Sequence, residues 1–202
     1  MAQPAVLFYP EAAPVPSGLQ TPEFVLEPLR TTHVELDYAA LMDSKAMLRT
    51  WSQSDWPSDA FTLEDNYRDL DEHEREHHAR VAFTYTVLSP DANSCLGCVY
   101  IRPLAPVLEQ DDLRAAPAGG RYRGRTAFWV RQSRLADELD RRVLAALIDW
   151  FRRAWAFDRM VFYTNAQNER QVQILSEAGL QQRYRIERRK ADGQQQRLEM
   201  FA

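Results

Sequence analysis

One stretch in the second half of the chain has a clear helical repeat of apolar residues. From residue 136 onward, an apolar side chain recurs at every fourth position: Leu139, Val143, Leu147 and Phe151. This spacing puts all of them on one face of an α-helix. A short strand pattern at residues 126–130 runs directly into this helix, and another follows at 160–164. A strand, an amphipathic helix and a second strand in this order are typical of α/β proteins.

The rest of the chain supplies further strand and helix patterns. Strands are expected at residues 24–29, 82–88, 95–102, 180–189 and 194–201, the last two forming a hairpin around Asp192-Gly193. Helices are expected after Thr31 or Thr32, from a capping box at 62–65 to about residue 78, and over 167–178, where Gly179 ends the helix. Residues 50–61 are expected to form a loop. The order β-α-α-β-β-β-α-β-α-β-β predicts a mixed α/β (α+β) fold.

Domain organisation follows from proline content and length. Prolines recur through residues 1–22, at Pro4, Pro10, Pro14, Pro16 and Pro22, which predicts an extended N-terminal arm. Residues 23–202 contain no internal repeat and no second boundary, and a chain of this length suits one hydrophobic core. We therefore expect one domain over residues 23–202, preceded by an arm over 1–22.

Charge and hydropathy exclude several classes of protein. The net charge is −4 with both signs interspersed, which argues against a nucleic-acid partner. No stretch approaches the roughly 18 apolar residues of a membrane span. The N-terminus lacks a basic start, and its apolar run is too short for a signal peptide. A cytoplasmic protein without a membrane partner is expected.

Two patterns could suggest a metal, and the sequence favours neither. Cys95 and Cys98 are spaced as CxxC within a predicted strand, where residues i and i+3 point to opposite faces, so the thiols should diverge as small apolar fillers. Two cysteines alone do not complete a zinc site. His73 and His77 match HExxH, but their helix is charged nearly all round and no third histidine follows at the metzincin spacing. We expect no metal.

Three local features resemble the GNAT N-acetyltransferases, in the branch similar to ribosomal-protein N-acetyltransferases. Residues 95–101, Cys-Leu-Gly-Cys-Val-Tyr-Ile, resemble the family's third strand, and residues 127–131 run straight into the long helix. Asn168, Leu175 and Gly179-Leu180 follow the family's Asn, aliphatic and Gly-Phe pattern. The resemblance covers about residues 24–190. It implies a mostly antiparallel sheet whose fourth and fifth strands splay apart, flanked by about four helices.

The resemblance also implies acetyl-CoA as the acyl donor. In the family, backbone groups of the fourth strand pair with the pantetheine arm and the next helix start receives the pyrophosphate. The signature of that turn is Gln or Arg, two residues, Gly, one residue, then Gly or Ala. This chain has Arg131-Gln-Ser-Arg134-Leu-Ala136, with Arg134 in place of the central Gly. The cofactor-binding residues implied are Phe128, Trp129, Val130, Arg131, Arg134, Leu135, Ala136 and Asn168.

Catalytic residues do not carry over from the family. Thr126 stands about where many members have a basic carboxylate, and Leu175 stands where a tyrosine often serves as general acid. Trp51 or Trp56 could contact the acceptor or simply be buried. Two functions stay open: transfer of an acyl group to a primary amine of a small molecule, peptide or protein, and a catalytically silent domain that binds a ligand or partner. Either could be a monomer or a homodimer.

Overall fold

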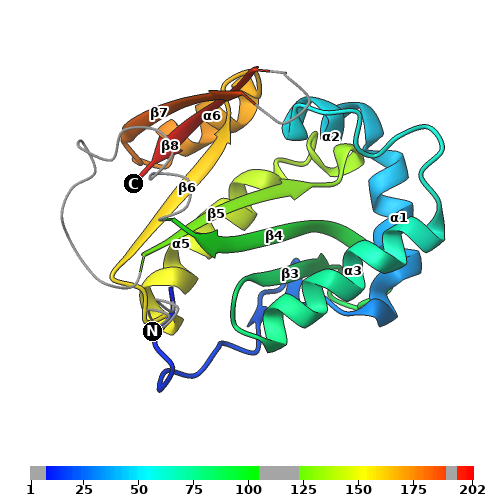
Figure 1. Ribbon diagram of the computed structural model, residues 1–202, viewed down its shortest axis with the longest axis horizontal. Helices are drawn as coiled ribbons and strands as arrows, with labels where there is room; N and C mark the ends of the chain where they lie inside the picture. The colour runs from blue at the N-terminus through cyan, green and yellow to red at the C-terminus, as the bar shows by residue number, and fades with distance from the viewer. Residues whose placement is uncertain (1–7, 105–122, 190–194) are drawn as a thin grey trace, which may run out of the picture.

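A single twisted sheet organises the molecule (Figure 1). The computed structural model describes residues 8–104, 123–189 and 195–202. The strands are β1 (Leu19–Gln20), β2 (Val25–Pro28), β3 (Phe83–Leu88), β4 (Cys95–Pro103), β5 (Arg123–Val130), β6 (Arg159–Asn165), β7 (Gln182–Arg189) and β8 (Gln195–Phe201). Their order is β1-β2-β3-β4-β5-β6-β8-β7, and only the β5–β6 pair is parallel. The predicted mixed, mostly antiparallel sheet is confirmed.

Helices cover both faces of this sheet. Those in the described residues are α1 (Val34–Asp43), α2 (Lys45–Ser52), α3 (Leu63–His78), α5 (Leu139–Ala154) and α6 (Glu169–Glu177). In Figure 1, α3 passes in front of β3 and α1 stands beside α3 to the right of β4, whereas α5 passes behind β5. The loop expected at residues 50–61 is shorter at its start, because α2 continues to Ser52.

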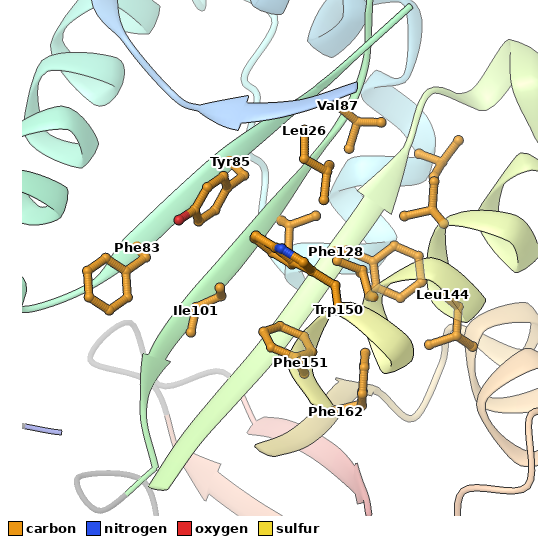
Figure 2. Packing of buried hydrophobic residues seen from close by; sticks show 14 of the residues in the cluster. Leu26, Phe83, Tyr85, Val87, Ile101, Phe128, Leu144, Trp150, Phe151 and Phe162 are labelled. Atoms are coloured by element: carbon orange, nitrogen blue, oxygen red, sulfur yellow. The ribbon is translucent and has the colours of Figure 1, made fainter. Parts of the chain in front are cut away.

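The larger core lies between the sheet and α5. Leu139, Val143 and Leu147 are almost fully buried, as the spacing of four residues between them predicted. Figure 2 shows Trp150 and Phe151 of α5 packed against strand residues that include Tyr85, Ile101 and Phe128. Each large apolar side chain buried in this way contributes about 1.5–3 kcal/mol. The amphipathic pattern thus fixes which face of α5 meets the sheet.

The opposite face of the sheet carries α1, α2 and α3. Leu41, Leu48 and Leu70, one from each helix, are buried there against Trp129 of β5. The predicted capping box of α3 is present: Asp65 N donates to Thr62 Oγ1 at 3.1 Å, and Thr62 N donates to Asp65 Oδ2 at 3.0 Å. At the end of α6, Gly179 has φ of +81°, as its expected place after the helix requires.

The N-terminal segment takes a larger part in the fold than an arm would. Within its described portion, residues 8–22, Phe8 and Tyr9 are buried in the core and β1 pairs with β2. Tyr9 packs edge-on against Trp155, which follows α5. The turn expected at Asp192-Gly193 lies outside the described residues, but β7 and β8 pair antiparallel as a hairpin requires.

A β-bulge in β4 changes which side chains share a face. Leu88 of β3 pairs with Cys95, whereas Val87 pairs with Gly97, so Leu96 is an extra residue. Gly97 has φ of +153°, and a Cβ there would lie 2.1 Å from the carbonyl oxygen of Trp129. The bulge shifts the alternation by one, and both Cys95 and Cys98 face α1. The expectation that their thiols diverge is wrong, because it assumed a regular strand.

Candidate functional site

The parallel strands β5 and β6 diverge in the middle of the sheet. They pair from Arg123↔Arg159 to Thr126↔Phe162 and no further. Beyond that point β5 continues to Val130 along β4, while β6 continues to Asn165 along β8. β5 and β6 are the strands that the sequence analysis expected as the fourth and fifth, because β1 was not expected. The predicted splay between them is therefore present.

A narrow pocket, here called the slot, lies at this splay between β5 and α6. It is lined by Met47, Trp51, Phe128, Trp129, Val130, Leu135, Asp140, Asn168, Arg170, Gln171 and Ile174. Five of the eight residues implied for cofactor binding are among them. Arg131, Arg134 and Ala136 are not. The slot encloses a volume of about 40 Å³, room for only a few water molecules.

Gln171 closes the inner end of the slot. Its Nε2 donates to the carbonyl oxygen of Phe128 at 2.7 Å, and Trp51 Nε1 donates to the same oxygen at 3.1 Å. Its Oε1 accepts from Thr164 Oγ1 at 2.7 Å and from Asn168 Nδ2 at 3.2 Å. The Gln171 side chain thus joins β5 to β6 across the splay, and the carbonyl oxygen of Phe128 accepts one hydrogen bond from Gln171 and one from Trp51.

Arg170 closes the outer end. Its Nε and Nη2 donate to the two carboxylate oxygens of Asp140 at 2.6 and 2.9 Å, and Nη2 also donates to the carbonyl oxygen of Leu135 at 2.9 Å. Asp140 is only 5% exposed, whereas the side chain of Arg170 is 42% exposed, so the bidentate pair is buried on its carboxylate side only. A second ion pair, Arg141–Glu177, links α5 to α6, and the hydrogen bond from Arg141 lowers the pKa of Glu177.

The turn before α5 differs from the expected helix start. Residues Gln132–Arg134 form a single 3₁₀ turn, Glu138 has φ of +57°, and α5 begins only at Leu139. Ala136, expected to open the helix, therefore lies before it. Arg134, in place of the family's Gly, folds back and donates from Nε to Asp137 Oδ2 at 2.8 Å.

The same turn is held by the end of α1. Arg131 Nε and Ser133 Oγ donate to Asp43 Oδ2 at 2.8 and 3.0 Å. Both hydrogen bonds lower the pKa of Asp43, and the one from Arg131 has the larger effect. The backbone N–H of Gln132 donates to Ser44 Oγ at 2.9 Å. The position of α1 therefore decides the position of the turn.

Asn168 caps α6 and also lies at the slot. Its Oδ1 accepts from the backbone N–H of Gln171 at 3.3 Å, which caps α6. The same residue lines the slot. Its position at the start of α6 could be predicted, whereas its contact with Gln171 could not.

A second, larger pocket opens on the other side of the splay. It encloses about 380 Å³ and is lined by Trp51, Ser52, Arg102, Arg125, Ala127, Tyr163, Asn165, Gln196 and Leu198. Trp51 lines both pockets. The sequence alone had left open whether this tryptophan lies at a site or is simply buried. Trp56 instead packs edge-on against Phe61 beside the α1–α3 core.

Neither position considered for proton transfer holds a titratable group. Thr126 is fully buried at the last β5–β6 pair, and its hydroxyl has no hydrogen-bond partner in the described part of the chain. Leu175 is buried in the core between α6 and the sheet. The catalytic residues stay unassigned.

The two histidines of the HExxH match are packed rather than solvated. His73 lies against Tyr100 with its Nδ1 3.3 Å from Glu76, and His77 lies against Phe83 and Tyr85. Burial lowers the pKa of both imidazoles. In the described residues, neither belongs to a group of three potential metal ligands.

Comparisons with known proteins identify the fold. No protein-family model and no curated protein matches the chain. Among solved structures, a RimL ribosomal L7/L12 α-N-protein acetyltransferase in complex with coenzyme A is 15% identical with a TM-score of 0.68, over 90% of this chain and 93% of that one. A ribosomal-protein-S5-alanine acetyltransferase from Vibrio fischeri is 16% identical with a TM-score of 0.68, over 91% and 94%.

A third similar structure is a microcin C7 self immunity acetyltransferase, MccE, in complex with acetyl-CoA and AMP. It is 12% identical with a TM-score of 0.71, over 93% of this chain and 96% of that one. At these identities the likeness establishes the fold. The chain has the GNAT fold that its sequence predicted, and it shares that fold with these three acetyltransferase structures.

Proposed function

We propose that this chain, with its GNAT fold, is an acyl-CoA-dependent N-acyltransferase that moves an acetyl group from acetyl-CoA to a primary amine. The observation that carries the proposal is the pair of pockets on the two sides of the splay, which share Trp51. A donor on one side and an acceptor on the other would meet between β5 and β6. The solved structures with coenzyme A or acetyl-CoA bound support this assignment.

The phosphates of acetyl-CoA and its pantetheine arm fit this chain to different degrees. Arg131 and Arg134, each partly exposed in the turn before α5, supply cations for the phosphates. Phe128, Trp129, Val130, Leu135 and Asn168 line the slot proposed for the pantetheine arm. The arm does not fit the slot as the structure has it, because the slot encloses only about 40 Å³ and its lining residues Gln171 and Arg170 hydrogen-bond the carbonyls of Phe128 and Leu135. Binding therefore requires these two side chains to move.

Acyl transfer to an amine needs the amine in its deprotonated form. Neither Thr126 nor Leu175 titrates near neutral pH, so the proposed reaction depends on holding the amine next to the acyl carbon rather than on a side-chain base. The acceptor is an amine of a small molecule, a peptide N-terminus or a protein. The proposed transfer uses no metal ion.

A catalytically silent domain is the second candidate, and the contacts across the slot favour it. Gln171 and Arg170 satisfy groups that a cofactor would otherwise contact, and the carboxylates of Asp137 and Asp140 neutralise nearby arginines. Such a domain would bind a ligand or a partner protein through the larger pocket and leave the slot closed.

Calorimetric titration with acetyl-CoA distinguishes the two candidates. We expect a dissociation constant in the micromolar to sub-millimolar range, followed by release of the free coenzyme A thiol when amines of the three acceptor classes are added. No heat and no thermal shift at millimolar acetyl-CoA would establish the silent domain instead.

The cellular setting belongs to the same proposal. In the described residues no helix is both long enough and apolar enough to cross a membrane. The net charge of −4 gives no electrostatic footprint for nucleic acid. We propose a cytoplasmic enzyme, a monomer or a homodimer, without nucleic-acid or membrane partners.

A further inference from the structure

Three potential metal ligands meet beneath α1, on the side of the sheet away from α5. Asp37 comes from α1, and Cys95 and Cys98 come from β4. Asp37 Oδ1 lies 3.8 Å from Cys95 Sγ and 3.4 Å from Cys98 Sγ. The three ligand atoms lie within 4.8 Å of one another, and each residue is at most 3% exposed.

These separations are close to those of a metal site. A tetrahedral zinc ion with Zn–S of about 2.3 Å and Zn–O of about 2.0–2.2 Å places its sulfur and oxygen ligands about 3.6 Å apart and its two sulfurs about 3.8 Å apart. The observed S–O distances of 3.4 and 3.8 Å bracket the first value. The two S–O distances would need to change by about 0.2 Å to suit a bound ion, and the S–S distance, which is at most 4.8 Å, by no more than about 1 Å.

An amide side chain of α3 is a candidate for the fourth ligand. Asn66 of α3 hydrogen-bonds Asp37 and is 1% exposed. Its Nδ2 donates to the carbonyl oxygen of Val34 at 3.1 Å, whereas its Oδ1 has no hydrogen-bond partner in the described residues. A buried amide oxygen without a partner is costly to the fold, and coordination of a cation would satisfy it.

We propose that Asp37, Cys95 and Cys98 bind one thiophilic divalent cation, zinc in the first place, with Asn66 as the fourth ligand. On binding, the cation forms bonds to both sulfurs and to the carboxylate, and the two thiol protons pass to solvent, with no change of oxidation state. The site is structural. It joins α1 to β4, and α1 in turn holds the turn before α5 through Asp43 and Ser44.

The inference does not depend on the proposed acyl transfer. The alternative is a metal-free cluster in which both thiols donate hydrogen bonds to the buried carboxylate. The metal site and the metal-free cluster differ in whether added Co²⁺ gains thiolate ligands. The chain contains only two cysteines, so a thiolate–cobalt signal can arise only from this cluster.

The test is to produce the full chain in cobalt-supplemented medium and, separately, in zinc-supplemented medium. We expect one metal ion per chain by elemental analysis and a near-ultraviolet thiolate-to-Co²⁺ charge-transfer band. Removing the metal with a chelator should lower Tm by roughly 5–10 °C, as loss of a ligand held at about 100 times its Kd would. The wild-type band identifies the ligands even if a cysteine variant does not fold.

Two variants locate the metal. Cys98→Ser should lose both the ion and the band, whereas His77→Ala, which changes the HExxH helix instead, should keep both. Metal retained by Cys98→Ser but lost from His77→Ala would overturn the proposal in favour of a histidine site. Wild-type protein from both media with no metal and no band would overturn it in favour of the hydrogen-bonded, metal-free cluster.

Discussion

Replacing Gln171 with Ala tests whether the slot is held closed by the protein's own side chain. In the wild type, a ligand amide that pairs with the Phe128 carbonyl must first break the 2.7 Å bond from Gln171. Such a bond contributes about 0.5–1.5 kcal/mol net. Because each 1.4 kcal/mol is a factor of ten, Gln171→Ala should bind coenzyme A roughly 2- to 10-fold more tightly than wild type.

The same change should lower stability. It leaves the Thr164 hydroxyl and the Asn168 amide without their acceptor, which costs about 1–3 kcal/mol of unfolding free energy. For a protein of this size, each kcal/mol lowers Tm by about 2–4 °C. Tighter binding by a less stable protein is an unusual combination, and it separates a closed slot from general damage.

Calorimetry with coenzyme A and thermal unfolding are the two assays. Gln173→Ala is the matched control, since Gln173 lies on the same helix but is exposed and contacts Glu177 instead. The control should leave affinity unchanged. If Gln171→Ala binds coenzyme A more weakly than the control does, then Gln171 is a ligand contact and our reasoning about the slot is wrong.

Three further predictions concern the turn, the α6 cap and pH. Arg134→Gly should weaken coenzyme A binding and reduce its salt dependence if Arg134 leaves Asp137 for a phosphate; tighter binding by the variant would show that the arginine blocks the site. Asn168→Ala should lower coenzyme A affinity more than the roughly 1 kcal/mol expected from loss of a cap; an effect on Tm alone would leave only the capping role. Burial lowers the folded-state pKa of His73 and His77, so the unfolded chain binds more protons below its pKa of about 6.5, and their contribution to stability is lost as pH falls from about 7 towards 5. Urea unfolding at several pH values should show a shallower loss in a His73→Phe/His77→Phe variant, and an equal slope would contradict the assignment.

The sequence alone determined the features that depend on local pattern. The fourfold apolar repeat fixed the buried face of α5, the Thr62–Asp65 capping box fixed the start of α3, and Gly179 fixed the end of α6. These signals are local because helix periodicity and capping act over one or two turns. Their order along the chain predicted a mixed α/β fold, and the resemblance of three local segments to the GNAT family implied the splayed strands.

Tertiary structure decided which side chains meet across elements. Gln171 crosses to β5 and Arg170 reaches Asp140, although 43 and 30 residues separate each pair of partners. Residue spacing carries no information about such contacts, because they depend on how α5 and α6 pack around the splay.

The cysteines show the same limit at the scale of one strand. A period of two predicted that Cys95 and Cys98 point to opposite faces, but the extra residue Leu96 reverses the alternation. Gly97 permits this bulge, because a Cβ at that position would lie 2.1 Å from the carbonyl oxygen of Trp129 on the neighbouring strand. Only pairing with β3 and β5 could therefore bring both thiols onto Asp37.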